Sequence, residues 1–301
     1  MAKHILLTGG AGLLGNDLTR LLLYKGYKVS HLSRSPGKDA RVKTYLWDIN
    51  KGLIDEKSID GVDIIIHLAG AGIADKRWTK KRKKELIDSR TRSIELIYQL
   101  IKNKPNQVKT VISASATGYY SDRGDELLTE TSSPSNDFLS DCCIQWEEAV
   151  DKGEVLGLRI LKFRTGVALT AKGGALPQLA RPVKLGIGSP LGSGKQWMPW
   201  IHHHDVVNMY LYGIENEHLK GVYNMVAPNP VTNRQLTRAV ANQLFKPLWL
   251  PNIPAFVLKL LFGEMSIVVL GSTKVSAQKI EEAGFKFKFS EISEALKDIY
   301  K

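Results

Sequence analysis

The segment HILLTGGAGLLG, residues 4–15, decides the fold of this chain. A short apolar run, predicted to be a strand over 4–8, leads directly into a glycine-rich loop, and a helical pattern begins at residue 13. A tight turn after a strand favours residues without a Cβ, and a pyrophosphate needs close approach to the backbone. The amino-terminus of the following helix offers free N–H groups and the positive end of its dipole.

This order of strand, glycine loop and helix predicts a dinucleotide site. The alternative is a turn that is purely structural. The residues expected to contact the cofactor here are Gly9, Gly12, Leu13, Leu14 and Gly15.

The first half of the chain goes on alternating short apolar runs with helical patterns. Further strands are predicted over 28–33, 43–47, 62–68, 110–114 and 157–163. Helices are predicted over 13–25, 82–102, 138–152 and, later, 204–216. Such alternation is typical of a parallel sheet that helices cover on both faces.

After Gly166 the composition changes, because glycine and proline become frequent and proline-rich turns separate short helices in the tail. We therefore expect an α/β fold, a Rossmann-like doubly wound parallel sheet with a smaller interleaved C-terminal α+β lobe. The expected dinucleotide-binding domain comprises 1–165 and about 200–226, and the expected substrate-side domain comprises about 166–199 and 227–301.

The charge balance raises the question of nucleic acid as a partner. With 42 lysines and arginines against 30 acidic residues, the net charge is +12. Seven of the basic residues fall in one run, KRWTKKRKK, from Lys76 to Lys84. A local run is usually a solvated helix start and less often an anion-binding patch. Without a stacking motif, zinc finger or helix-turn-helix signature, we expect nucleic acid to be an improbable partner.

The cellular compartment of the protein is predicted from its apolar segments and its cysteines. We find no secretory signal and no long apolar span, and the most apolar late stretch, 256–271, carries two charges and is predicted to be a buried helix. Cys142 and Cys143 are adjacent, which suits neither a disulfide nor a metal site. We expect a cytoplasmic protein without a membrane partner or a metal.

The second strand indicates which cofactor binds. A site for NAD carries an acidic residue about twenty residues after the loop, and its carboxylate accepts a hydrogen bond from the ribose 2′-hydroxyl. Here HLSRS, residues 31–35, has no acid and contains Arg34, whose guanidinium suits a 2′-phosphate. NADP is therefore favoured over NAD. Asp48 could accept from the adenine amino group, and Ala69 and Gly70 could let the backbone approach the ribose.

Arg90 falls on the apolar stripe of a predicted helix. A buried guanidinium needs an anion, which is either a phosphate of cofactor or substrate or a structural carboxylate. The stripe consists of Leu86, Ile87, Ile94, Ile97, Tyr98 and Ile101.

Several motifs resemble the extended and atypical short-chain dehydrogenase/reductase superfamily: the loop TGGAGLLG, the segment HLAG and the serine segment SASATGY. Downstream, FRTGVALTAKGGALP, PLGSGKQWMPWIHHHDV, APNPVTN, LFGEMS and EEAGFKF are similar to the nucleoside-diphosphate-sugar epimerase-like family. That family has its own C-terminal domain, and some members carry the label cell division inhibitor. The resemblance covers essentially the whole chain and implies a Rossmann lobe, a smaller substrate lobe and NAD(P) binding.

The resemblance also implies roles for single residues. Ser115 would be the catalytic serine, with Thr117 near the substrate. Arg164, Thr165 and Gly166 would flank the nicotinamide. His202 and Asp205 match the family's turn into a helix, where we expect Asp205 to be the cap.

The chain departs from the superfamily at the proton-transfer pair. Hydride-transferring members use Tyr-x-x-x-Lys on the helix after the serine. The matching helix reads DFLSDCCIQWEE, with Phe138 in the tyrosine position and Cys142 in the lysine position. Tyr119 or Tyr120 is the predicted substitute, because each follows Ser115 closely, and His202 is another candidate.

Three functions fit these features. The first is an NADP-dependent oxidoreductase or epimerase acting on a polar small molecule, by family analogy a nucleotide sugar, with Gln196 and Trp197 in the pocket wall. The second is a non-catalytic NADP-binding protein in which the cofactor sets a regulatory or scaffolding surface. The third, a binder of nucleic acid or an acidic partner through the basic run, has the least support.

Overall fold

The apolar runs of the first half form the central sheet. The structure is a computed structural model that describes residues 2–301, and within them this sheet has eight strands. Its strands pair in parallel throughout, apart from the antiparallel contact between β3 and β4. In spatial order they are β12 (Gly221–Met225), β8 (Arg159–Thr165), β6 (Thr110–Ala116), β5 (Ile64–His67), β1 (His4–Thr8), β2 (Lys28–Ser33), β3 (Lys43–Asp48) and β4 (Leu53–Ile54).

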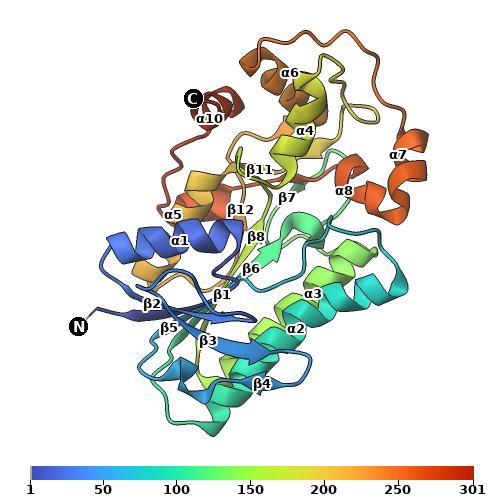
Figure 1. Ribbon diagram of the computed structural model, residues 1–301. Helices are drawn as coiled ribbons and strands as arrows, with labels where there is room; N and C mark the ends of the chain where they lie inside the picture. Colours follow the sequence, from blue (N-terminus) through green and yellow to red (C-terminus); the bar gives the residue numbers. More distant parts are fainter. Residues whose placement is uncertain (1) are drawn as a thin grey trace.

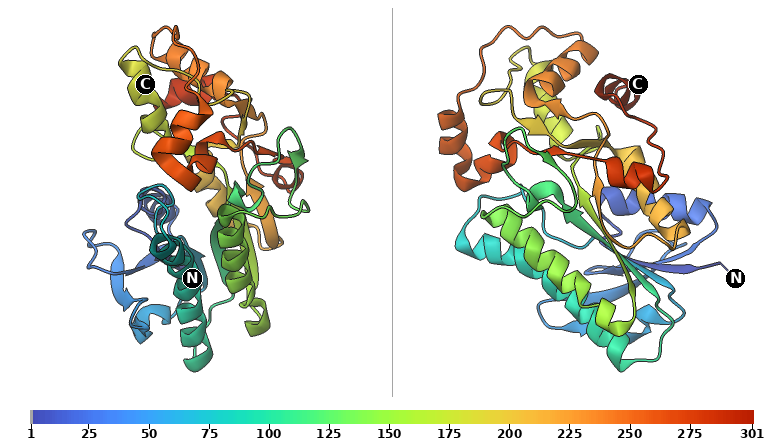
Figure 2. Two further views of the ribbon diagram at one scale, coloured as in Figure 1. Left: turned by 90° about the vertical axis from the view of Figure 1, so that its right-hand side faces the viewer. Right: turned by 180° about the vertical axis from the view of Figure 1, so that it is seen from behind.

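Helices cover both faces of this sheet. Helices α2 (Lys80–Asn103) and α3 (Phe138–Asp151) lie side by side on one face, and α1 (Leu13–Tyr24) and α5 (His203–Glu215) on the other (Figures 1 and 2). Each pair closes a separate apolar core. Because helices cover both faces of the sheet, all five residues of β1 are buried. The middle three are apolar, and His4 and Thr8 form hydrogen bonds. The predicted Rossmann-like fold is confirmed.

Local hydrogen bonds explain where the elements differ from their predicted bounds. Helix α2 begins two residues early because Thr79 accepts a hydrogen bond from the N–H of Arg82. The predicted strand over 157–163 is shifted to Arg159–Thr165, because Gly157 lies in the left-handed region with φ of 75° and ends a turn of 3-10 helix.

A smaller lobe lies above the carboxyl ends of the sheet (Figure 1). Its core joins apolar side chains from three helices with Trp200. The strand β7 (Leu127–Leu128), from the first half, pairs there with β14 (Lys274–Val275). The other elements of this region are β9 (Val167–Leu169), α4 (Ala175–Lys184), β10 (Trp197–Met198), β11 (Trp200–His202), β13 (Val231–Thr232), α6 (Asn233–Gln243), α7 (Ala255–Phe262), α8 (Ile267–Leu270), α9 (Gln278–Glu282) and α10 (Ile292–Ile299).

The stretch 256–271 is helical but is not buried as predicted. It forms α7, a turn of 3-10 helix and α8, yet Phe256, Leu260 and Leu261 are 71%, 78% and 62% exposed. Apolar composition predicts burial only when another element covers the helix, and within residues 2–301 Leu258 is the residue of α7 that is covered. No helix in the described chain is long and apolar enough to span a bilayer.

Candidate functional site

The glycine loop has the geometry that a phosphate site requires. Gly9 has φ of 70°, and a Cβ on it would lie 3.0 Å from the carbonyl oxygen of Leu68. A Cβ on Gly15 would lie 2.3 Å from the carbonyl oxygen of Gly9. Gly12 precedes α1, and within residues 2–301 no side chain caps that helix. The N–H groups of its first turn therefore have no partner within the helix and can meet an anion.

The second wall of this site is the loop after β5. The hydroxyl of Thr8 accepts hydrogen bonds from the N–H groups of Leu68 and Ala69, both at 3.0 Å. This fixes the loop beside Gly9, as the cofactor prediction for Ala69 and Gly70 requires. The structure thus brings both loops to one edge of the sheet.

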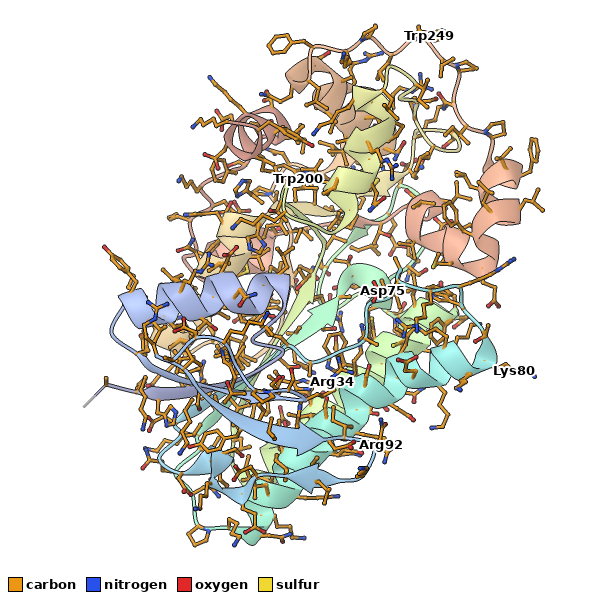
Figure 3. The ribbon with its side chains drawn as sticks, in the orientation of Figure 1. Arg34, Asp75, Lys80, Arg92, Trp200 and Trp249 are labelled. Carbon is orange, nitrogen blue, oxygen red and sulfur yellow. The ribbon has the colours of Figure 1, made fainter. Side chains whose placement is uncertain are left out.

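Arg34 follows β2, and Asp48 is the last residue of β3, at the same edge of the sheet. Arg34 is exposed there (Figure 3). Asp48 Oδ1 accepts hydrogen bonds from the N–H groups of Asn50 and Lys51, so its carboxylate shapes a turn, and its Oδ2 lies 3.9 Å from Lys51 Nζ. Both positions are compatible with the predicted contacts to a 2′-phosphate and to adenine.

A cavity of about 220 Å³ lies at the carboxyl ends of β6 and β8, between α3 and α8. Five of the predicted site residues line it: Arg90, Thr117, Thr165, Gly166 and Trp197. Most of the remaining wall is apolar, and it includes Ile73, Leu139, Trp146, Val167, Met198, Pro199, Ile267 and Val268.

Arg90 provides a cation in the cavity wall. Its guanidinium donates to the carbonyl oxygens of Leu86 at 2.8 Å and Ala71 at 3.0 Å, and it lies 5.0 Å from the ring centre of Trp146. Burial lowers the pKa of Arg90. Among residues 2–301 its partners are carbonyls, a hydroxyl and a ring, and no carboxylate pairs with it.

Ser121 is a cavity residue that sequence reasoning missed. It is buried, and its hydroxyl has no hydrogen-bond partner among the described residues. Its φ of 51° places a residue other than glycine in the left-handed region, a strain that is found preferentially at ligand sites. No motif marks this position, since the serine simply follows the segment SASATGYY.

Ser115 and Arg164 do not line the cavity. The hydroxyl of Ser115 donates to Glu147 Oε1 at 2.6 Å. Arg164 donates to both oxygens of the same carboxylate, at 2.8 and 2.9 Å. The three side chains are buried between β6, β8 and α3. The carboxylate of Glu147 thus holds Ser115 by a hydrogen bond and Arg164 by an ion pair, and these contacts do not support the roles predicted for them in catalysis and at the nicotinamide.

The two tyrosines are also absent from the cavity wall that the described residues form. Tyr120 is fully buried and donates to Asn224 Oδ1 at 2.7 Å, and burial raises its pKa to about 12. Tyr119 packs edge-on against Tyr120, with the guanidinium of Arg164 3.4 Å from its ring centre. Packing thus accounts for both residues, and their contacts give no support to the prediction that either one replaces the missing tyrosine.

Phe138 and Cys142 stand in the positions predicted for the proton-transfer pair, and both have packing contacts. The ring of Phe138 packs 4.9 Å from that of Trp78. Cys142 lines the cavity, and burial raises the pKa of its thiol. Phe138 has no ionisable group and Cys142 stays a neutral thiol at neutral pH, so neither supplies the cation that the lysine of the pair would.

Of the two remaining predicted substrate residues, Trp197 lines the cavity and Gln196 does not. Trp197 lines the cavity and donates from its indole to Asp125 at 2.7 Å. Gln196 points elsewhere, because its amide donates to the carbonyl oxygens of Leu191 and Val269.

His202 has a structural role. Its ring lies 4.0 Å from that of Phe289, and its Nδ1 accepts from the N–H of His204, so His202 caps α5. Asp205, predicted to be that cap, instead accepts from the N–H groups of Lys288 and Phe289. Among residues 2–301 no cluster of ligands could hold a metal ion.

The parallel sheet, the glycine loop and the cavity at the carboxyl ends of the strands define a Rossmann-like α/β protein. Two sequence profiles match the chain: the NAD dependent epimerase/dehydratase family over residues 5–144, and a domain of unknown function (DUF1731) over residues 253–299.

Relatives match along the whole length. Epimerase family protein YfhF of Bacillus subtilis (strain 168) is 36% identical, covering 98% of this chain and 97% of its own. Epimerase family protein SA0724 of Staphylococcus aureus (strain N315) is 36% identical over 99% of both. The chain therefore belongs to the epimerase family, as the motifs indicated.

Solved structures agree. The crystal structure of human epimerase family protein SDR39U1 (isoform 2) with NADPH has a TM-score of 0.86 and 30% identity, over 99% of both chains. A nucleoside-diphosphate sugar epimerase from Corynebacterium glutamicum has a TM-score of 0.81 and 30% identity, covering 98% of this chain and 57% of that one.

Proposed function

We propose that this epimerase-family protein is an NADP-dependent oxidoreductase. The residues present fit the cofactor: the uncapped start of α1 would hold the pyrophosphate, where a Cβ on Gly15 would collide with the loop, and Arg34 would pair with the 2′-phosphate. The nicotinamide would lie against Thr165 and Gly166 in the cavity. The human relative at 30% identity, crystallised with NADPH, supports the choice of cofactor.

The cavity supplies hydrogen-bonding groups for the reaction. When bound, NADPH supplies a hydride. The hydroxyls of Thr117 and Ser121 would donate hydrogen bonds to a carbonyl oxygen, and the unpartnered hydroxyl of Ser121 carries this proposal. Within the described wall there is no tyrosine, so a proton would reach that oxygen from water through these hydroxyls.

The cavity favours a small substrate over a nucleotide sugar. A diphosphate needs several cations or N–H donors, whereas Arg90 is the one cationic side chain among the described residues of the wall. A volume of about 220 Å³ and largely apolar lining suit a compact carbonyl or hydroxyl compound. We therefore propose such a compound in place of the polar, nucleotide-sugar substrate expected from the sequence.

A non-catalytic NADP-binding protein is the second candidate. It is favoured by the fixation of Ser115 against Glu147 and by Phe138 and Cys142 in the positions of the proton-transfer pair. In that case the cofactor would set the position of the smaller lobe rather than react.

Titration of the purified protein with NADPH and with NADH tests the proposal, followed by nicotinamide fluorescence and thermal stability. We expect saturable binding that is tighter for NADPH. A panel of small carbonyl compounds and nucleotide sugars then separates the candidates. Turnover of a carbonyl compound supports the oxidoreductase. Cofactor binding without turnover of any substrate supports the non-catalytic protein. If the protein binds neither cofactor, the glycine loop is structural and both candidate functions are refuted.

A further inference from the structure

The helix α7 and the adjoining α8 present an apolar surface to solvent. Phe256, Leu260 and Leu261 are 71%, 78% and 62% exposed, and Phe262 and Val268 are each 38% exposed. Single exposed apolar side chains are normal on a soluble protein, whereas a contiguous group marks an interaction site. α7 protrudes from the edge of the molecule (Figures 1 and 3), so it offers a convex apolar ridge.

The basic run borders this ridge. Lys83 forms an ion pair with Glu264 at 2.6 Å, and a Cβ on Gly263 would lie 3.3 Å from the guanidinium of Arg77. The amino-terminal end of α2 and the α7–α8 segment face the same way, one below the other (Figure 2, left). The exposed cations of this surface are Lys76, Arg77, Lys80, Lys81 and Lys84. Lys80 is labelled in Figure 3.

We propose that this basic–apolar face, formed by residues 76–84 and 256–268, docks onto an anionic lipid bilayer. Apolar side chains that enter the interface, together with lysines at the level of anionic headgroups, are the combination that holds a peripheral protein on a membrane. The distribution of charge favours this occupant, since the chain carries +12 overall and five of the seven basic residues in the run 76–84 are exposed on this face.

Other occupants fit less well. Nucleic acid would pair with the lysines but leave the apolar ridge in water. A second copy of the chain would bring two basic runs together, which costs free energy through like-charge repulsion. This inference revises the expectation of no membrane partner, which depended on a buried 256–271 helix.

The face also adjoins the cavity. Ile73, just before the basic run, and Val268 of α8 both line it. Docking would therefore place this side of the cavity toward the bilayer. The inference does not depend on the reaction, because Lys80, Leu260 and Leu261 of the face lie outside the cavity wall.

Cosedimentation of the full chain with vesicles tests the proposal. We expect binding to vesicles of phosphatidylcholine with phosphatidylglycerol, little binding to phosphatidylcholine alone, and weaker binding as salt rises. Two double variants, Leu260→Ser with Leu261→Ser and Lys80→Glu with Lys81→Glu, should each lower vesicle affinity by about tenfold or more. Thermal unfolding shows that each variant is folded.

Matched controls lie outside the face. Tyr24→Ser with Val155→Ser changes side chains that are 86% and 90% exposed, and Lys286→Glu with Lys297→Glu makes the same change of charge elsewhere. These should keep wild-type binding. The proposal is overturned if anionic vesicles do not bind the protein, or if face and control variants lose binding equally. Light scattering that shows a dimer dissociated by the Leu260 and Leu261 changes would also overturn it, in favour of an interface between copies.

Discussion

The hydroxyl of Ser115 donates a 2.6 Å hydrogen bond to Glu147, and the same carboxylate accepts two hydrogen bonds from Arg164. One buried anion thus holds the end of β6, the end of β8 and the middle of α3 together. The family's serine position serves here as a structural link beside the cavity, and under the proposed function the reactive hydroxyls would come from neighbouring positions.

Glu147→Gln should therefore destabilise the protein strongly. Removing one partner of a buried pair leaves the other charge uncompensated, which typically costs about 3–5 kcal/mol. Lys162, 3.8 Å from the same carboxylate, adds to the unbalanced charge. Denaturant unfolding measures the loss. Glu148→Gln, one residue along and exposed, is the control and should change the free energy of unfolding by less than about 0.5 kcal/mol. Similar values for both variants would contradict the structural role.

Thr117→Val and Ser121→Ala should lower turnover without preventing NADPH binding. Each removes a hydroxyl that would contact the carbonyl oxygen, and the loss of one such donor lowers kcat by about 100-fold or more. Tyr119→Phe should leave kcat nearly unchanged, because that ring packs outside the cavity wall. Steady-state kinetics on a substrate from the panel measure these effects. A larger loss in Tyr119→Phe than in Thr117→Val would return the tyrosine to the mechanism.

Arg34→Ala should separate the two cofactors. Hydrogen bonds between charged groups contribute about 1.5–3 kcal/mol, so NADPH affinity should fall about 10- to 100-fold. NADH lacks the 2′-phosphate and should be nearly unaffected. Arg41→Ala is a control in the same loop, since that guanidinium is paired with Asp39. Fluorescence titration gives the dissociation constants of both cofactors for the wild type and each variant, and equal losses for NADPH and NADH in Arg34→Ala would remove the basis for NADP preference.

The fold could be predicted from sequence because its signals are local. The glycine loop between strand and helix, and the apolar runs of 4–8 and 110–114, each specify their element without help from distant residues. Bounds were missed where a side chain shifts a helix end, as Thr79 does for α2. Burial of 256–271 could not be predicted, because apolar composition does not say whether any element covers the helix.

The site was predicted less well, because it depends on the path of the backbone after each strand ends and on the direction in which the side chains point. Thr117, Arg90 and Trp197 were placed in the cavity from motif and periodicity. The family motif also implied a catalytic role for Ser115, but its hydroxyl bonds to Glu147, on a helix 32 residues further along the chain, and the motif gives no sign of that partner. Ser121 lacked any signal in sequence, since only its backbone conformation and its missing partner distinguish it.

The acid stability of the protein should depend on His202. Burial lowers the pKa of His202 from 6.5 to about 4, although Asp205 and Asp298 oppose the shift. The folded chain therefore binds this proton less readily than the unfolded chain does. The neutral ring contributes its full stability above pH 6.5, and that contribution is lost as the pH falls from 6.5 toward about 4.

His202→Asn isolates this contribution. Asparagine keeps an acceptor for the N–H of His204 at the start of α5 and cannot be protonated in this range. We expect the variant to be less stable at pH 7, because the packing against Phe289 is lost, but to lose less stability between pH 6.5 and 4 than the wild type. His218→Asn, at an exposed site, should follow the wild-type pH profile. His67 is also buried with a pKa lowered to about 3, so some acid sensitivity should remain in every variant. Denaturant unfolding across this pH range measures the slopes, and an unchanged slope in His202→Asn would show that the ring is not the titrating group.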